Sequence, residues 1–446
     1  MMNYEKPASS GPEPKFKPRL IIHGGAGNAS RENITPDKYE AYRAALISFV
    51  TRTNAYMTTP VQKPTQGRPL GSLPSALEVA TFAVVQLEDH PLFNSGHGAV
   101  FTRDGINELE ASVMVSRGYK KRGVGVMGLR HVRNPILLAR KMLEHGEEDL
   151  VAASGPDVPS AQGHTQLFGE TAEKLARQYG LDMVDPSYFF TQHRWDEHIR
   201  SLEREGAGRG LASWDAESYL PQGTVGAVAL DEDGVICTAT STGGLTNKLT
   251  GRIGDTPAPG AGFWAEEWTE GGDPTGSRVW SPRPDQPAMI LSGALKGMLA
   301  DCLPTPWMYS PLQEPHRCLN ATTTTRSIAV SGTGNGDSFL RVGAARTTAA
   351  MARFKPEPGA DAVTHVAGPG GELQRSAGER WMKTGEGEGG MIGIECAVVR
   401  GEDGGLVEAR AAILQDYNCG GMFRAWIDDD GKAVMSIWTN GSPDKR

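Results

Sequence analysis

Residues 224–242 have the pattern of a β-hairpin, and this segment constrains the fold more than any other part of the chain. Two stretches of alternating side chains flank a short polar turn that ends at Gly234. A three-residue loop with glycine in the left-handed conformation at its last position is a favoured hairpin connection. Taking residues 232–234 as that loop pairs Asp231 with Val235, so that the two numbers of each predicted pair sum to 466.

This register places Thr224 directly opposite Thr242. Side chains directly opposite each other on an antiparallel pair share one face, with Cβ atoms about 4.5–5.5 Å apart. A slip of one residue would bring Ser241 opposite Thr224 and turn Thr242 to the other face. Two facing threonines can also simply fill a β surface. The pair therefore indicates a catalytic role only together with the residues around it.

Gly223 directly precedes Thr224, at the point where a loop enters the first strand of the hairpin. A threonine hydroxyl is a weak nucleophile and needs an adjacent base. If the chain were cut before Thr224, the new α-amine, with a pKa of about 7.7–8.0, could accept the hydroxyl proton without His or Lys. Glycine suits the residue before the cut because it tolerates strained backbone geometry. The dipeptide is therefore a candidate cleavage site, and a plain turn-to-strand junction is the alternative.

The composition indicates a soluble globular protein of 446 residues, with 39% hydrophobic and 22% charged residues. A formal net charge of −8 argues against nucleic acid or an acidic membrane surface as the main partner. The sequence contains no run of about 18 apolar residues, so we expect no membrane span. The five cysteines are odd in number and lack a C-x-x-C motif, which favours reduced thiols in the cytoplasm over a disulfide framework.

Local patterns predict helices and strands along the rest of the chain. Thr35 before Pro36 is typical of a helix N-cap, and Ser75 with Glu78 predicts a capping box at the start of a second helix. The expected helices are 36–51, 75–87, 134–145, 171–179 and 338–353, and the expected strands are 19–23, 99–102, 111–115, 327–331, 390–399, 409–414, 422–427 and 434–438. Loops are expected at 52–72 and 355–390, the second with one helix.

Three further segments are expected to lie outside the packed core. Residues 1–18 are polar and proline-containing, which predicts a disordered tail and no signal peptide. Residues 203–223 are rich in Gly, Ser and charged side chains, which predicts a flexible linker. Residues 264–326 are rich in Trp, Pro and Gly, and we interpret them as an insertion.

Five groups of residues are informative because they occur together. They are residues 23–27, 93–98, 223–226, 241–257 and 333–337. In combination they closely resemble the plant-type (type 2) L-asparaginase/isoaspartyl peptidase family of N-terminal nucleophile (Ntn) hydrolases, which is related to glycosylasparaginase. The resemblance implies an α/β fold in four layers, αββα, with two stacked and mainly antiparallel sheets between helical layers. It also implies a single domain whose α-subunit part is 19–223 and whose β-subunit part is 224–446.

The resemblance assigns catalytic roles residue by residue. It makes Thr224 the nucleophile, exposed when the chain cleaves itself at Gly223–Thr224, and Thr242 the second threonine that hydrogen-bonds it. It makes Thr333 and Gly334 the oxyanion donors, one through a hydroxyl and the other through a backbone N–H. Fixed donors aimed at developing negative charge are usually the largest single contribution to catalysis.

The same resemblance makes Arg252 and Asp255 the pair that binds the α-carboxylate and α-ammonium of the substrate. A guanidinium fork suits a carboxylate, and one charge of each sign suits a zwitterion. Gly334 and Gly336 are implied to bind substrate in the same pocket, and Asn94 to line it and help position the nucleophile. The alternative for Arg252 and Asp255, three residues apart, is a simple surface ion pair.

Residues 87–97 resemble the family's sodium-binding loop, in which backbone carbonyls hold a structural cation. The implied ligands are the carbonyls of Leu87, Glu88, His90, Phe93, Ser95 and His97. No other cofactor is expected. Residues 24–27 lack the spacing of a nucleotide-binding glycine loop, and the histidines lack metal-ligand spacing with cysteines or acids.

Three departures from the family pattern leave the subtype open. The usual Glu-x-Asp-Ala appears here as residues 108–111, with Glu110 in place of the aspartate. Cys419 stands where the family often carries threonine, and Asn335 and Asp337 follow the glycosylasparaginase pattern. The chemistry is therefore better defined by the sequence than the preferred substrate.

We expect an autocatalytically processed amidohydrolase that releases L-aspartate from L-asparagine, from β-aspartyl (isoaspartyl) dipeptides, or from both. The alternatives are a glycosylasparaginase-like or taspase-like hydrolase of the same fold, or a non-catalytic scaffold that retains the fold. The expected partner is a small amino-acid or dipeptide substrate, and the expected assembly is a homodimer of processed αβ pairs.

Overall fold

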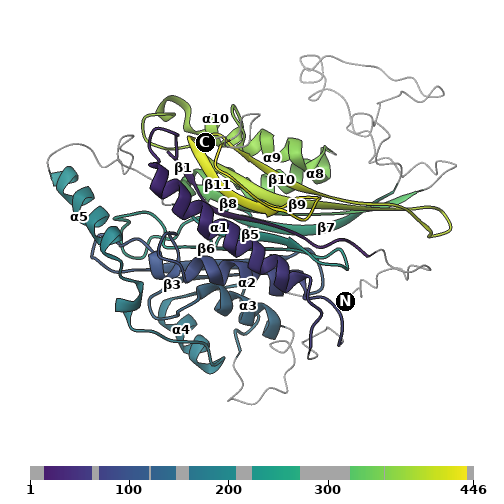
Figure 1. The fold of residues 1–446 in the computed structure, drawn as a ribbon, viewed down its shortest axis with the longest axis horizontal. Helices are drawn as coiled ribbons and strands as arrows, with labels where there is room; N and C mark the ends of the chain where they lie inside the picture. Colours follow the sequence, from purple (N-terminus) through teal and green to yellow (C-terminus); the bar gives the residue numbers. More distant parts are fainter. Residues whose placement is uncertain are drawn as a thin grey trace, which may run out of the picture. The chain divides into compact units, whose positions relative to one another are not determined.

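The computed structural model describes residues 15–62, 70–119, 122–146, 160–206, 223–271, 322–355 and 357–438 (Figure 1). The chain divides into two units. The smaller unit contributes residues 269–271, 322–326 and 397–409 to the described part, and within it Arg326 lies 3.8 Å from Glu270 in an ion pair. The larger unit consists of Glu13–Trp268, Ser327–Cys396 and Arg410–Arg446, and it contains the candidate site.

In the described part of the chain, eight strands form one sheet and four form another. The strand order is β12-β11-β1-β5-β6-β2-β3-β4 in the larger sheet and β10-β9-β8-β7 in the smaller. Neighbours in the larger sheet are antiparallel, except that β3 and β4 are parallel. The larger sheet comprises β1 (Arg19–Gly27), β2 (Leu109–Val115), β3 (Gly123–Leu129), β4 (Gln166–Phe168), β5 (Val225–Leu230), β6 (Ile236–Thr242), β11 (Gly421–Ile427) and β12 (Ala433–Ser436). The smaller comprises β7 (Phe263–Gly271), β8 (Thr323–Gly334), β9 (Gly389–Arg400) and β10 (Leu406–Tyr417).

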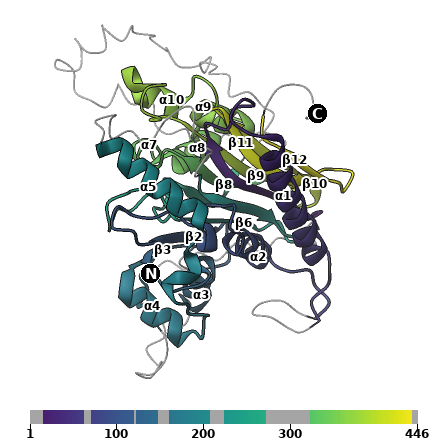
Figure 2. The same ribbon diagram turned by 60° about the vertical axis from the view of Figure 1, so that its left-hand side comes forward.

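Two groups of helices cover the strands, and Figures 1 and 2 show α2–α4 and α8–α10 on opposite sides of them. One group shares a hydrophobic core with the larger sheet: α1 (Pro36–Met57), α2 (Ala76–Glu88), α3 (Pro135–Glu144) and α4 (Gly169–Gln178). The other shares a core with the smaller sheet: α7 (Gly336–Val342), α8 (Ala344–Phe354), α9 (Gly359–Ala367) and α10 (Glu372–Ala377). No helix in the described ranges has both the length and the apolar character that a bilayer crossing requires.

Alternate residues of each strand face different layers, as the two-residue period of a strand dictates. Leu20 and Ile22 of β1 belong to the core beneath α1–α4, whereas Ile21 belongs to a third core that lies between the sheets. In β8, Val330 belongs to the core beneath α7–α10 and Ala329 to the inter-sheet core. The layers are therefore helix, sheet, sheet and helix, which confirms the αββα prediction.

The predicted register of the β5–β6 hairpin is confirmed. The two strands pair antiparallel, and every pair, such as Val225 with Ser241, has numbers that sum to 466. Gly234 ends the turn with a φ of 79°, the left-handed conformation that the three-residue loop requires. Thr224, one residue before β5, is therefore placed opposite Thr242 at the end of β6.

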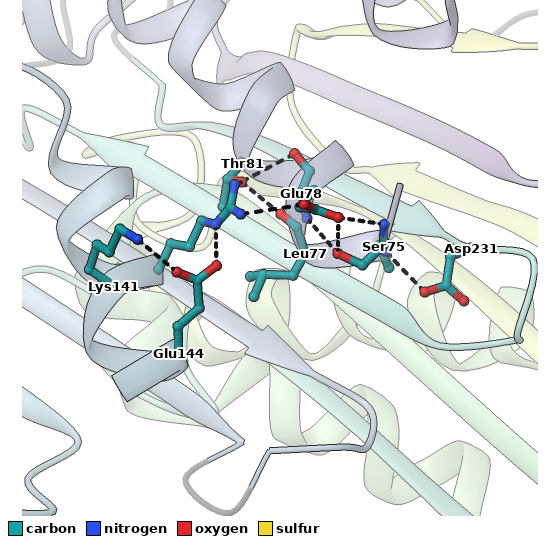
Figure 3. A network of polar contacts seen from close by, with 9 residues as sticks. Ser75, Leu77, Glu78, Thr81, Lys141, Glu144 and Asp231 are labelled. Carbon is teal, nitrogen blue, oxygen red and sulfur yellow. Dashed lines mark hydrogen bonds and ion pairs between the residues drawn. The ribbon is translucent and has the colours of Figure 1, made fainter. Parts of the chain in front are cut away.

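A polar network ties the turn of this hairpin to two helices (Figure 3). An Asp231 carboxylate oxygen accepts the N–H of Ala76, at the start of α2, at 3.1 Å. Ser75 and Glu78 form the predicted capping box at the same helix terminus. Arg140 of α3 lies 3.8 Å from the Glu78 carboxylate. These contacts fix the turn of the hairpin that positions the candidate nucleophile against helices α2 and α3.

Some predicted boundaries were wrong. Helix α1 runs to Met57, beyond its predicted end, because Thr53 and Met57 near its C-terminal end are buried in the core. The helix predicted at 338–353 is divided into α7 and α8 at Gly343, whose φ is 55°. Residues 99–102 were predicted as a strand, but Thr102 makes only an isolated bridge.

Other predictions missed whole elements or lie partly outside the described residues. The sequence patterns missed β3, and they missed α5 (Gln192–Gly206), which enters the segment predicted as a linker. The segment 355–390 holds two α-helices, α9 and α10, instead of one. The described ends of the predicted insertion belong to β7 and β8. The predicted tail up to residue 14, the linker at 207–222 and the insertion at 272–321 lie outside the described residues.

Candidate active site

A pocket in the larger unit brings together most of the predicted site residues. The space between its walls measures about 260 Å³ when the part open to solvent is included. Its walls are formed by Glu110, Thr224, Thr242, Gly244, Leu245, Arg252, Gly254, Asp255, Gly334 and Gly336. Three predicted residues, Gly223, Asn94 and Thr333, adjoin this wall through chain neighbours or hydrogen bonds. Four wall residues were not predicted from the sequence, namely Glu110, Gly244, Leu245 and Gly254.

Three neighbouring strands place three pocket residues in one row. Glu110 of β2 is opposite Thr242 of β6, and Thr242 is opposite Thr224 in the confirmed register. By the alternation of strand side chains, this row shares the face of Val228, which belongs to the inter-sheet core. Thr333 lies on the corresponding inter-sheet face of β8, in the opposing sheet. The candidate nucleophile and the candidate oxyanion donor therefore approach the pocket from two different sheets.

Gly223 packs closely against the glycine-rich end of β1 and against Thr333. A Cβ built on Gly223 would lie 2.4 Å from the Cα of Gly25, 2.5 Å from the nitrogen of Ala26 and 2.7 Å from Thr333 Oγ1. The Thr333 hydroxyl also accepts the N–H of Ala26 at 3.2 Å. Because two of those three atoms belong to the backbone, only glycine fits at position 223.

The hydroxyl of Thr224 contacts a residue that the sequence analysis did not single out. Its Oγ1 lies 3.4 Å from Oγ1 of Thr256, which is fully buried. The Thr242 hydroxyl, predicted to bond Thr224, accepts the N–H of Gly244 at 3.0 Å, and within the described residues no hydrogen bond joins it to Thr224. Thr256 directly follows Asp255 in the chain, and this adjacency is the sequence signal from which Thr256 could have been predicted as a site residue.

We expect Thr256→Val to slow cleavage before Thr224 about tenfold, because it removes one hydroxyl that orients the nucleophile while preserving shape. The measurement is a time course of the two fragments on denaturing gels. Thr256→Ser keeps the hydroxyl and should cleave at nearly the wild-type rate. Thr348→Val removes a buried hydroxyl that bonds within α8, so it should leave cleavage unchanged. Equal rates for the Val and Ser variants of Thr256 would contradict this role.

Arg252 and Asp255 converge on Gly336 at one side of the pocket. A Cβ on Gly336 would lie 2.5 Å from Asp255 Oδ1 and 3.1 Å from Arg252 Nη2. The absence of a side chain at position 336 therefore leaves room for both groups. Arg252 Nη2 forms an ion pair with Asp337 Oδ1 at 3.2 Å, without hydrogen-bond geometry. The buried Asp255 Oδ2 has no hydrogen-bond partner within the described residues. This pair is suited to a zwitterion that brings both a carboxylate and an ammonium group.

The ionisation of Asp255 sets an expected pH dependence. Burial raises the pKa of Asp255 to about 7; Arg252 opposes this shift, and Glu110 and Asp337 add to it. Binding of the ligand's ammonium group requires Asp255 in its carboxylate form. The affinity for L-aspartate should therefore fall about tenfold per pH unit below pH 7 and level off above it. Calorimetric titration with L-aspartate measures this binding without turnover. An affinity that stays constant from pH 8 to pH 5.5 would contradict the assignment.

Asn94 holds the segment that leaves β6 after Thr242. Its Nδ2 donates to the carbonyl of Gly244 at 2.7 Å, and its Oδ1 accepts the N–H of Val100 at 3.1 Å. The backbone carbonyl of Asn94 accepts the N–H of Gly243 at 3.0 Å. The side chain is almost fully buried and acts on the pocket wall through Gly244.

The segment 87–97, predicted to hold sodium, runs from the last two residues of α2 through a tight loop into a 3-10 helix at Gly96–Gly98. A Cβ on Gly96 would lie 2.3 Å from the carbonyl oxygen of Glu88, and one on Gly98 would lie 2.2 Å from that of Phe93. The buried Ser95 hydroxyl has no hydrogen-bond partner within the described residues. In those same ranges, no three His, Cys, Asp or Glu side chains gather as a metal-binding group. The carbonyls of Leu87, His90, Phe93 and Ser95 each accept a backbone N–H from a nearby residue.

The four layers and this pocket define the class of the protein. Two stacked sheets between helical layers, with a threonine placed at the start of a central strand, are the architecture of an Ntn hydrolase. A family model described as asparaginase matches residues 16–277. The chain belongs to this asparaginase family and is a hydrolase, which confirms the resemblance found in the sequence.

Curated relatives agree with this family. The chain is similar to an isoaspartyl peptidase of Escherichia coli K12, with 40% identity over 55% of this chain and 67% of that protein. It is similar to a plant-type L-asparaginase of Pyrococcus furiosus, with 35% identity over 56% of this chain and 70% of that protein. A probable isoaspartyl peptidase/L-asparaginase 2 of Arabidopsis thaliana is 31% identical over 56% of this chain and 72% of that protein.

Proposed function

We propose that this protein cleaves itself between Gly223 and Thr224 and then hydrolyses the side-chain amide of L-asparagine or of β-aspartyl dipeptides. The observation that carries the proposal is the pocket in which Thr224 shares one wall with Arg252 and Asp255. A zwitterionic aspartyl group held by the charged pair would extend its side-chain carbonyl toward the threonine. The names of the relatives, isoaspartyl peptidase and plant-type L-asparaginase, support the same substrate class.

The proposed cycle has two halves. Thr224 Oγ1 attacks the amide carbon while the α-amine of Thr224 takes the hydroxyl proton. The oxyanion accepts hydrogen bonds from the Thr333 hydroxyl and the Gly334 N–H. The C–N bond then breaks, and ammonia or an amino acid leaves with that proton. Water attacks the resulting β-aspartyl ester, releases L-aspartate and restores the threonine hydroxyl.

The surroundings of Thr224 favour its own amine as the base. His23 lies on the adjacent strand, is fully buried, and has Nε2 2.8 Å from the hydroxyl oxygen of Ser331. Burial lowers the pKa of His23 to about 3. An imidazole of that pKa is a far weaker base than an α-amine, whose pKa is about 7.7–8.0.

Aspartate release from three substrates tests the proposed function. We expect purified and fully cleaved protein to release L-aspartate from L-asparagine or β-aspartyl-leucine faster than from glycosylasparagine. Preference for glycosylasparagine, or cleavage of a protein after aspartate, would favour the glycosylasparaginase-like or taspase-like alternative. Cleaved protein without any of these activities would favour a non-catalytic scaffold.

We also propose that the loop at 87–97 binds a structural sodium ion through the carbonyls of Leu87, Glu88, His90, Phe93, Ser95 and His97. The close packing of the Glu88 and Phe93 carbonyls against Gly96 and Gly98, and the buried Ser95 hydroxyl without a partner among the described residues, support a compact, polar loop of this kind. The ion would stabilise the loop before Asn94 and take no part in the reaction. Replacing sodium with choline at constant ionic strength should lower the thermal midpoint, and an unchanged midpoint would contradict the site.

We further propose, from the family resemblance, that two processed αβ pairs associate as a homodimer in the cytoplasm. The three described cysteines, Cys237, Cys396 and Cys419, are free thiols, as a reducing compartment would favour. Light scattering on cleaved protein gives the mass of the assembly. A mass equal to one processed chain of 47.7 kDa would contradict the dimer.

A further inference from the structure

Two carboxylates, one at the start of β2 and one just before it, hold the loop that contains Arg252 and Asp255. Glu110 of β2 accepts the N–H of Gly254 through both oxygens, at 3.0 and 3.3 Å. Glu108, two residues earlier, accepts the N–H of Gly251 at 2.7 Å. Gly251 and Gly254 flank Arg252 in the chain, so the two carboxylates hydrogen-bond the loop backbone on either side of that arginine.

Glu110 is the member of this pair that reaches the pocket. It lines the pocket wall, is only 1% exposed, and stands in the same row across the sheet as Thr242 and Thr224. A Cβ on Gly254 would lie 3.0 Å from Arg252 Nη1 and 3.2 Å from Glu110 Oε2, so these two groups occupy the same side of the loop.

The charges around Glu110 fit a support for the loop. Burial raises the pKa of Glu110, whereas Lys248 and Arg252 oppose that shift. Lys248 is itself buried and donates to the carbonyl of Glu108 at 2.8 Å. Removing one partner of a buried carboxylate that accepts a backbone N–H beside two cations lowers the stability of the fold. The position of the Glu110 carboxylate is therefore strongly determined.

We propose that Glu110 is a positioning residue for substrate recognition: by holding the Gly254 amide, it sets where Arg252 and Asp255 meet the α-carboxylate and α-ammonium of the substrate. This role deepens the proposed function and rests on it. Glu110 acts through the loop and leaves the attack by Thr224 to other residues. Its loss should therefore weaken binding more than turnover.

Kinetics of three matched variants of the cleaved enzyme test this role. Glu110→Ala should raise KM for L-asparagine about tenfold or more, with kcat within threefold of wild type, since it removes the acceptor of the Gly254 N–H. Glu110→Gln keeps an amide oxygen as acceptor and should restore KM to within about threefold. Glu173→Gln is the control, because Glu173 accepts the backbone N–H groups of Arg130 and His131 away from the pocket.

Hydrogen–deuterium exchange separates this proposal from the proposed function. Peptides that cover residues 251–255 should exchange faster in Glu110→Ala than in wild type or Glu110→Gln, whether or not the protein hydrolyses asparagine. Wild-type protein without hydrolysis would refute the proposed function, while the exchange result would still decide whether Glu110 holds the loop. Wild-type KM together with wild-type exchange in Glu110→Ala would overturn the positioning role.

Discussion

Thr224→Ala is expected to yield a single uncut chain and to lose hydrolysis by about 10⁴-fold or more. The substitution removes the hydroxyl that attacks both the Gly223 carbonyl and the substrate amide. It also prevents release of the α-amine that serves as the base, so one change disables two functions. Denaturing gels report the uncut chain, and aspartate release reports the lost activity.

Thr224→Ser is the matched control, because serine supplies the same hydroxyl and, after cleavage, the same α-amine. Its cleavage should be slower than that of wild type but should still produce two fragments. N-terminal sequencing of the second fragment should then begin at residue 224. Full activity from protein whose bond before Thr224 is intact would refute the proposed chemistry.

Local sequence determined the hairpin that carries the nucleophile. Glycine at position 234 and the two-residue alternation on either side define a turn type, and the turn type fixes the register. The capping box at Ser75 and the N-cap at Thr35 were predictable for the same reason, since their hydrogen bonds lie within four residues. Such signals need no knowledge of the rest of the fold.

Other elements depend on packing that the local sequence does not show. The last turn of α1 continues to Met57 because its side chains reach the core, although the local residues resemble a loop. Gly343 has a φ of 55° and ends α7, whereas the surrounding apolar pattern is continuous enough to predict one helix. In both cases tertiary contacts and backbone geometry override the periodicity.

The candidate site divides in the same way. Arg252, Asp255 and Thr333 were identified through family resemblance, because their meeting depends on two sheets and a long loop. Thr256 and Glu110 were missed as site residues, since their roles come from contacts with Thr224 Oγ1 and the Gly254 N–H. The sequence held only indirect signals for them: a hydroxyl next to Asp255, and a glutamate where the family pattern has aspartate.

The second large effect is expected at Thr333, where loss of the hydroxyl should lower kcat about 10²–10³-fold with little change in KM. Thr333 is fully buried, its Oγ1 would lie 2.7 Å from a Cβ built on Gly223, and its hydroxyl accepts the N–H of Ala26. Because that backbone N–H occupies a lone pair, the hydroxyl proton remains free to point toward a developing oxyanion. Thr333→Val keeps the shape and removes only this donor.

Two comparisons isolate the donor from its packing. Thr333→Ser should recover most of kcat, because a serine hydroxyl can make the same hydrogen bond. Thr238→Val removes another buried hydroxyl of the inter-sheet layer, one that donates to the Val330 carbonyl at 3.1 Å, and should change stability without changing kcat. The neighbouring Gly334 has a φ of 146°, and a Cβ there would lie 2.4 Å from the Glu388 carbonyl oxygen, so its backbone is held in one position. If Thr333→Val turned over substrate as fast as wild type, the Thr333 hydroxyl would not be an oxyanion donor, and the Gly334 N–H alone would have to stabilise the oxyanion.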